Sequence, residues 1–170
     1  TRVTAPSLGA VSTDTTSTHP SDAADDADLT AADVAWNLET LIEGTDVDAL
    51  LDRSDELTDQ LESYRLRVAE LDAGGLAAAM RTMAELQEVQ GRVGYYAMLR
   101  FSENTADPER GALMMKVQER STTLATRLVF FELEWAAVDE APVEELLSDP
   151  RLDFCAHHLR SMHRYRDHML

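Results

Sequence analysis

Apolar residues recur every three or four positions along most of the chain from residue 36 onward. This spacing places side chains on one face of an α-helix, so it predicts three long helices over residues 45–71, 76–101 and 107–138. The longest apolar stripe belongs to the third helix and consists of Leu113, Val117, Leu124, Leu128, Phe131, Trp135 and Val138. No alternating strand pattern of useful length appears. We therefore expect an all-α fold, an elongated antiparallel bundle of three long helices plus one or two short helices.

Capping residues and glycines set the expected ends of these helices. Thr45 and Asp48 have the spacing of a capping box, and Gly74-Gly75 is expected to stop the first helix. Asp107-Pro108-Glu109 is the clearest helix start in the chain. Gly91 and Gly94 lie inside the second helix, where each costs roughly 1 kcal/mol relative to Ala, so a close approach by another helix is the expected compensation.

The end of the chain predicts shorter helices. Pro142 permits a short helix through Leu147, and Asp149-Pro150 repeats the cap-and-proline pattern. We expect a final helix to follow directly. Its apolar positions are Leu152, Cys155, Leu159 and Met162.

Residues 1–34 differ from the rest because no large apolar residue recurs there at a helical or strand period. One Arg stands against six Asp, a net charge of −5. We predict a flexible acidic tail over 1–34, which is either an interaction tail or an inert extension, and one helical domain over 35–170. Order is expected to begin near Trp36-Asn37-Leu38.

The charge of the whole chain excludes some partners. Asp and Glu number 32 against 15 Lys and Arg, a formal net charge of −17, which repels phosphate backbones and anionic lipid. We expect neither nucleic-acid nor membrane partners. The single cysteine, Cys155, cannot form an internal disulfide, and no secretory signal or long apolar run is present, so we expect a cytoplasmic protein.

Catalytic signatures are absent from the sequence: it has no HExxH, no phosphate-binding glycine loop, no GxSxG and no pair of CxxC motifs. We therefore assign no catalytic, cofactor-binding or metal-binding residue. Four histidines invite a zinc hypothesis, namely His157, His158, His163 and His168. Three of them are five residues apart and rotate round a helix, which favours a polar helix face instead. That face also carries Arg160, Arg164 and Arg166.

Methionines and aromatic residues raise one further possibility. An adaptable peptide-binding groove could be built from Met80, Met83, Met114 and Met115, because thioethers repack easily, but core filling is the favoured interpretation. Phe130, Phe131 and Trp135 are also interpreted as core.

Several spaced segments agree in order with a known family. They are GRVGYYAMLRFSENTADPERGALMMKVQER, FFELEW, LLSDPRL and HHLRSMHRYRDHML, preceded by Trp36-Asn37-Leu38. Over roughly residues 36–170 the chain resembles the N-terminal region of oligoendopeptidase F, in the wider thimet oligopeptidase family.

The resemblance implies a substrate-enclosing helical domain of a zinc endopeptidase that hydrolyses short peptides. In that family zinc and HExxH belong to a catalytic domain absent from this chain, so this segment alone should be inactive and no residue role is carried over. The partners implied are a peptide substrate and the missing domain. An apolar face that this domain would cover is then expected to be exposed and to self-associate. The alternative is an independent helical protein-interaction module.

Overall fold

The computed structural model describes residues 36–168, with side chains up to Arg166. The chain divides into two units, Thr1–Trp36 and Asn37–Leu170, and all the helices described below belong to the second. The predicted tail over 1–34 lies outside the described residues. Within residues 36–168 the structure is helical with no strand, which confirms the all-α prediction.

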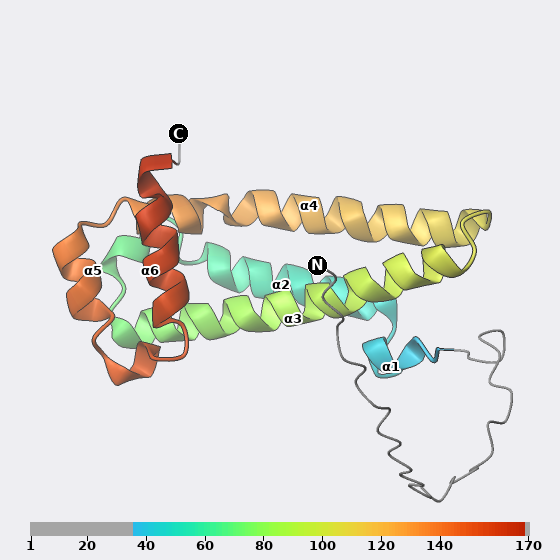
Figure 1. The fold of residues 1–170 in the computed structure, drawn as a ribbon, viewed down its shortest axis with the longest axis horizontal. Helices are drawn as coiled ribbons and strands as arrows, with labels where there is room; N and C mark the ends of the chain where they lie inside the picture. Colours follow the sequence, from blue (N-terminus) through green and yellow to red (C-terminus); the bar gives the residue numbers. More distant parts are fainter. Residues whose placement is uncertain (1–35, 169–170) are drawn as a thin grey trace, which may run out of the picture. The chain divides into compact units, whose positions relative to one another are not determined.

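Three long helices dominate the second unit (Figure 1). In chain order the α-helices are α1 (Glu39–Ile42), α2 (Val47–Glu62), α3 (Ala73–Glu103), α4 (Pro108–Ala136), α5 (Glu140–Leu146) and α6 (Ala156–Arg164). Short 3-10 turns are η2 (Val68–Glu70), η3 (Pro150–Leu152) and η4 (Tyr165–His168). Consecutive long helices run antiparallel, and each of α2, α3 and α4 packs against the other two.

The predicted apolar stripes form the core of this bundle. From α4 the core takes Val117, Leu128, Phe131 and Trp135. Leu113 of α4 and Val138, which follows the helix, are partly buried against this core. The aromatic residues interpreted as core are buried: Phe130, Phe131 and Trp135 are 7%, 1% and 1% exposed. Periodicity therefore located the buried faces correctly, because burial of an apolar stripe is what stabilises a helix in a domain.

The end of α2 differs from the prediction of a helix over 45–71. The helix stops at Glu62, and Leu66 adopts the left-handed region with φ 64°. Its N–H donates to Oε1 of Glu134 at 2.7 Å, and the N–H of Val68 donates to Oε2 at 3.2 Å. A carboxylate on α4 thus supplies partners for backbone groups that a continued helix would have bonded internally.

The two adjacent glycines after this turn begin a helix instead of ending one. Asp72 is the N-cap of α3, and its carboxylate accepts the N–H of Gly75 at 2.7 Å. A Cβ on Gly75 would lie 3.2 Å from Leu71 Cδ2 and 3.3 Å from the Asp72 carboxylate, so a side chain there would require one of these groups to shift by a few tenths of an ångström. The predicted stop at Gly74-Gly75 is therefore wrong.

Caps elsewhere agree in part. Asp107 accepts the N–H groups of Glu109 and Arg110, as the Asp-Pro-Glu start of α4 predicted. The N-cap of α2 is Asp46 without a side-chain hydrogen bond, so the predicted capping box from Thr45 does not form. Asp149 caps the 3-10 turn η3 and not α6, and the Arg151 side chain and N–H hold the pKa of its carboxyl at about 2.

Trp135 and His163 fasten α6 to the end of α4. The indole N–H donates to the Leu159 carbonyl at 2.9 Å, and the two rings meet edge to face with centroids 6.3 Å apart. His163 Nε2 lies 2.7 Å from the Val138 carbonyl, which can only accept, so Nε2 is the donor. These contacts hold α6 across the ends of α3 and α4 (Figure 1).

Candidate interaction surface

The histidines considered for zinc do not gather. His157 and His158 are exposed on α6, whereas His163 is buried and engaged with the α4 end. The side chain of His168 lies outside the described part of the chain. Within that part, no three His, Cys, Asp or Glu side chains are grouped as a metal site would require. The polar-face interpretation holds for Arg160, which bonds Glu144 of α5 at 3.1 Å.

The methionines separate into two places. Met80 is buried and Met83 is half-buried near the start of α3, beside α6. Met114 and Met115 lie near the start of α4, at the other end of the antiparallel helices, and Met115 is 66% exposed. Core filling is correct for Met80 and wrong for Met115. A single groove built from all four methionines does not form.

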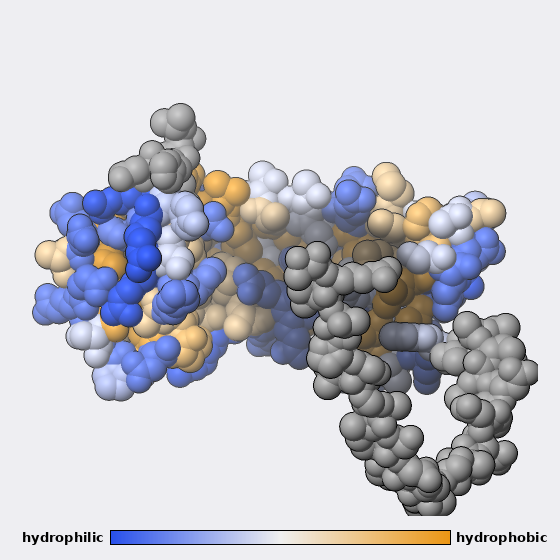
Figure 2. All heavy atoms as spheres, in the orientation of Figure 1, coloured by the Kyte–Doolittle hydropathy of each residue, from blue (hydrophilic) through white to orange (hydrophobic). Residues whose placement is uncertain are grey.

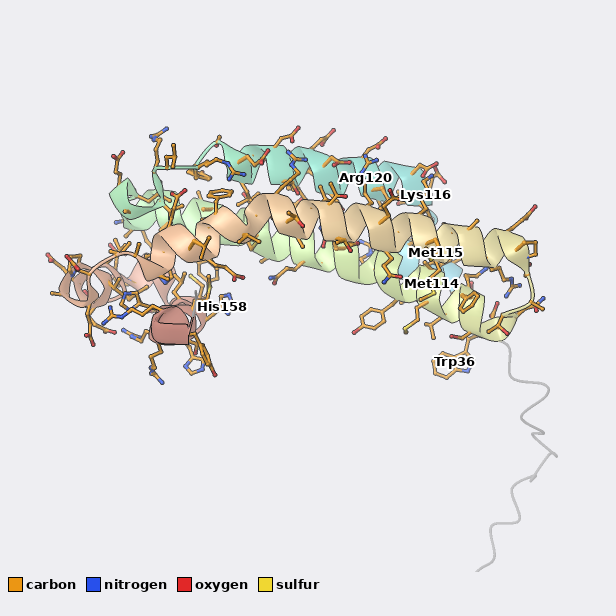
Figure 3. The ribbon with its side chains drawn as sticks, turned by 90° about the horizontal axis from the view of Figure 1, so that it is seen from above. Trp36, Met114, Met115, Lys116, Arg120 and His158 are labelled. Atoms are coloured by element: carbon orange, nitrogen blue, oxygen red, sulfur yellow. The ribbon has the colours of Figure 1, made fainter. Side chains whose placement is uncertain are left out.

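The side of α4 facing α2 is charged, and we call its paired residues the ion-pair seam. The acids of α2 are Asp48, Asp52, Asp55, Asp59 and Glu62, and the bases of α4 are Lys116, Arg120 and Arg127. Both sets step by three, four or seven along helices that run the same way, so one stripe meets the other along its length. Figure 3 shows Lys116 and Arg120 on the α2 side of α4.

Arg127 is the most connected residue of the seam. Its Nη2 bonds Asp59 and lies 2.5 Å from Glu62 Oε2, and its Nη1 lies 3.7 Å from Asp55. The hydrogen bonds from Arg127 and from Arg65 hold the pKa of Glu62 below its ordinary value of 4.5. The same carboxylates raise the pKa of the Arg127 guanidinium further above neutral pH.

The opposite side of α4, together with the neighbouring side of α3, carries almost no charge. We call this surface the α3–α4 face. On α3 it comprises Met83, Gln87, Gln90, Gly91, Gly94, Tyr95 and Met98. On α4 it comprises Met114, Gln118, Ser121, Thr122, Ala125, Val129 and Glu132. Figure 3 shows Met114 on this side of α4, away from Lys116 and Arg120.

Two charged residues in this stretch of α3, Glu85 and Arg92, turn elsewhere, whereas the exposed Glu88 lies at the edge of the face, three residues before Gly91. Glu85 bonds Arg53 of α2 at 2.6 Å, and Arg92 donates to the Leu41 carbonyl and pairs with Glu43. Helical geometry explains the separation, since residues three or four apart share a face while their neighbours in sequence do not. The centre of the face is thus uncharged within a strongly acidic protein.

A groove of about 360 Å³ lies at the α6 end of this face. Its floor is apolar and includes Met80, Leu86 and Phe131, while Gln87, Gln90, Glu132 and His158 supply its polar groups. Along the rest of the face, a Cβ added to Gly91 or Gly94 would meet nothing within 4 Å. The close helix approach predicted at these glycines is therefore not made within the described chain.

Several apolar side chains project from the face beside this hollow. Tyr95 is 60% exposed, Met98 41% and Val129 48%. Figure 2 shows hydrophobic atoms at the surface along the long helices, whereas the end that carries α5 and α6 is mostly hydrophilic. Exposed apolar surface next to open glycines marks the α3–α4 face as a candidate interaction surface.

Sequence reasoning identified neither the seam nor the face. Both could have been found by marking charged residues on the predicted helices, because the seam residues share one helical stripe and the face residues share another.

Comparison of the chain with protein-family models, with curated proteins and with solved structures gave no match. The protein is therefore classified by its fold and surfaces alone, as an all-α bundle with one largely uncharged face that no helix covers. Among the described residues, no helix is long and apolar enough to cross a membrane.

Proposed function

We propose that the chain is the N-terminal, substrate-enclosing domain of a cytoplasmic zinc-dependent oligoendopeptidase that hydrolyses short peptides. Zinc and its HExxH helix would be supplied by a catalytic domain outside this sequence. The proposal rests on the resemblance over residues 36–170 and on what the resembling residues do in the fold.

The observation that carries the proposal is that these residues hold helices together. Asp107 caps α4, Glu134 bonds the backbone of the turn after α2, and Trp135 fastens α6. Tyr96 donates to Glu39 of α1 at 2.9 Å. Residues engaged in this way build a scaffold, which fits a domain that shapes a channel more closely than one that performs the chemistry.

The groove between α3, α4 and α6 supports the enclosing role. Its apolar floor and its two glutamine side chains match a peptide, which offers both apolar side chains and backbone amide groups. Under the proposal, this groove belongs to the wall that faces the substrate.

The continuation of the reading frame past Leu170 tests the proposal. We expect further helices followed by HExxH. A stop codon directly after Leu170 would contradict the proposal and favour the second candidate function, an independent helical interaction module, which the neutral α3–α4 face supports.

A biochemical test uses the chain itself. We expect no cleavage of quenched fluorescent peptides and no zinc retained after dialysis, because the sequence lacks HExxH and the histidines whose side chains the structure describes do not converge. One tightly held zinc per chain, or peptide cleavage that survives further purification, would refute the assignment of the chemistry to another domain.

A further inference from the structure

The α3–α4 face combines a hollow with projections on the same helix. Gly91 and Gly94 leave the α3 backbone open, while Tyr95 and Met98 project one turn or less away. A two-fold axis through such a surface places the projections of one copy over the hollow of the other. An isologous interface requires this self-complementarity.

Charge selects a second copy as the occupant. The chain carries a net charge of −17, so most pairings of two copies would set carboxylates against carboxylates. The α3–α4 face is different because its two carboxylates lie away from its centre, Glu132 at the α6 end and Glu88 at the edge of α3. Two copies can therefore meet through this face without opposing charges at its centre.

The available area reaches the lower limit of a specific dimer. The face follows 16 residues of α3 (83–98) and 19 residues of α4 (114–132), or about 24–29 Å at a rise of about 1.5 Å per residue. Two helices about 10 Å apart give it a width of about 20 Å. This amounts to about 500–550 Å² per copy and about 1,000–1,100 Å² in total, close to the smallest area of a specific interface, about 1,000 Å².

We propose that two copies of this chain form a symmetric dimer through the α3–α4 face, with the α3 helices crossing at Gly91 and Gly94. Tyr95 of each copy packs over the glycines of the partner. The inference goes beyond the proposed function and concerns the 170-residue chain by itself. The groove at the α6 end is part of the same face, so pairing covers the surface that the proposed function assigns to the substrate, and the two uses of the face exclude each other.

Sedimentation velocity and light scattering on the full 170-residue chain, over a range of concentrations, test the pairing. We expect a monomer–dimer equilibrium with a dissociation constant on the order of 10 µM, as suits a small interface. Raising the salt concentration strengthens the pairing because it screens the net charge. A monomer throughout, or larger open-ended assemblies, would overturn the proposal.

Charged substitutions identify the face. Tyr95→Glu places two carboxylates at the centre of the interface, and it is expected to weaken pairing by about 30-fold or more. Gln60→Glu is the matched control, since it adds the same charge to an exposed position of α2. Equal dimerisation by the two variants would show that the copies meet elsewhere.

Substitution of a glycine should affect stability and dimerisation in opposite directions, which an effect on folding alone would not do. Gly94→Ala is expected to raise the melting temperature in dilute solution, because its Cβ meets nothing, yet to weaken pairing several-fold by holding the helices apart. Stronger or unchanged pairing would overturn the close crossing at Gly94.

Cross-linking locates the axis directly. With the buried Cys155 replaced by Ala, a Gly94→Cys chain should form an oxidised covalent dimer, whereas Gln60→Cys should not. Failure of Gly94→Cys to cross-link faster than Gln60→Cys would contradict the proposed axis.

Discussion

The two sides of α4 differ in the charge of the residues that they carry. Toward α2, Lys116, Arg120 and Arg127 meet carboxylates along the ion-pair seam. On the α3–α4 face, both α4 and α3 carry mostly uncharged residues. The comparison teaches that charges pair where two helices of the chain already meet, and that the uncharged side is the one left without a covering helix.

Arg127 allows the strongest test of this difference. Arg127→Gln leaves Asp55, Asp59 and Glu62 facing one another without their shared cation, so we expect a loss of about 1–2 kcal/mol in the free energy of unfolding. This figure allows for solvent screening, because the side chain is 28% exposed. Urea unfolding, with the slope unchanged, measures the loss.

Gln118→Glu is the matched control because it changes the net charge equally on the other side of α4. We expect a change within about 0.5 kcal/mol, as at an ordinary surface position. Similar losses for the two variants would mean that net charge, and not the pairing at the seam, sets the stability.

The open glycines give the next largest effect, with the opposite sign. Gly91→Ala and Gly94→Ala should each stabilise the monomer by about 0.5–1 kcal/mol, because alanine loses less backbone freedom and its Cβ meets nothing. Gly75→Ala on the same helix should give no such gain, since its Cβ would crowd the Asp72 cap. Thermal unfolding at concentrations too low for association decides between these outcomes.

The sequence was sufficient to predict which side of each long helix is buried, but not where the helices end. The seven apolar residues of the predicted third helix are all buried or partly buried, because a stripe sustained over about seven turns has no other stable environment. The break after Glu62 could not be predicted in this way. It depends on Glu134, which lies 68 residues beyond Leu66 and meets it only after α4 has packed.

The candidate interaction surface could not be predicted from the sequence for a related reason. Propensity alone indicated that Gly91 and Gly94 need a compensating contact, but it could not say whether that contact lies inside the chain or outside it. The acidic stripe of α2 is visible from Asp48 to Glu62, yet only the packed structure shows that α4 supplies its partners. The resemblance to a zinc peptidase stays a prediction.

Acid should weaken the seam through Glu62. Its pKa in the folded protein is below 4.5, the ordinary value, because Arg127 and Arg65 bond the charged form. The folded state therefore binds this proton more weakly than the unfolded state. The stabilisation is present above pH 4.5 and is lost as the pH falls through the folded pKa.

Unfolding midpoints between about pH 3 and pH 7 test this dependence. The curves of the unmodified chain and of Glu62→Gln should converge at low pH. The exposed Glu88 on α3 provides the control variant Glu88→Gln, which removes one carboxylate without changing the seam. A constant gap between the unmodified chain and Glu62→Gln across the range would exclude Glu62 as the titrating group.

Salt should produce the smallest effect and should separate the two sides of α4 once more. Between about 0.1 M and 1 M NaCl the screening length falls from about 10 Å to about 3 Å. The loss caused by Arg127→Gln should then shrink by a few tenths of a kcal/mol, because the seam is partly open to solvent and screening reaches its ion pairs. The gain in the free energy of unfolding from Gly91→Ala involves no charged group, so salt should not change it. If salt altered the glycine effect and the Arg127 effect by the same amount, the salt dependence would not arise from the ion pairs of the seam, and the contrast between the two sides of α4 would not be electrostatic.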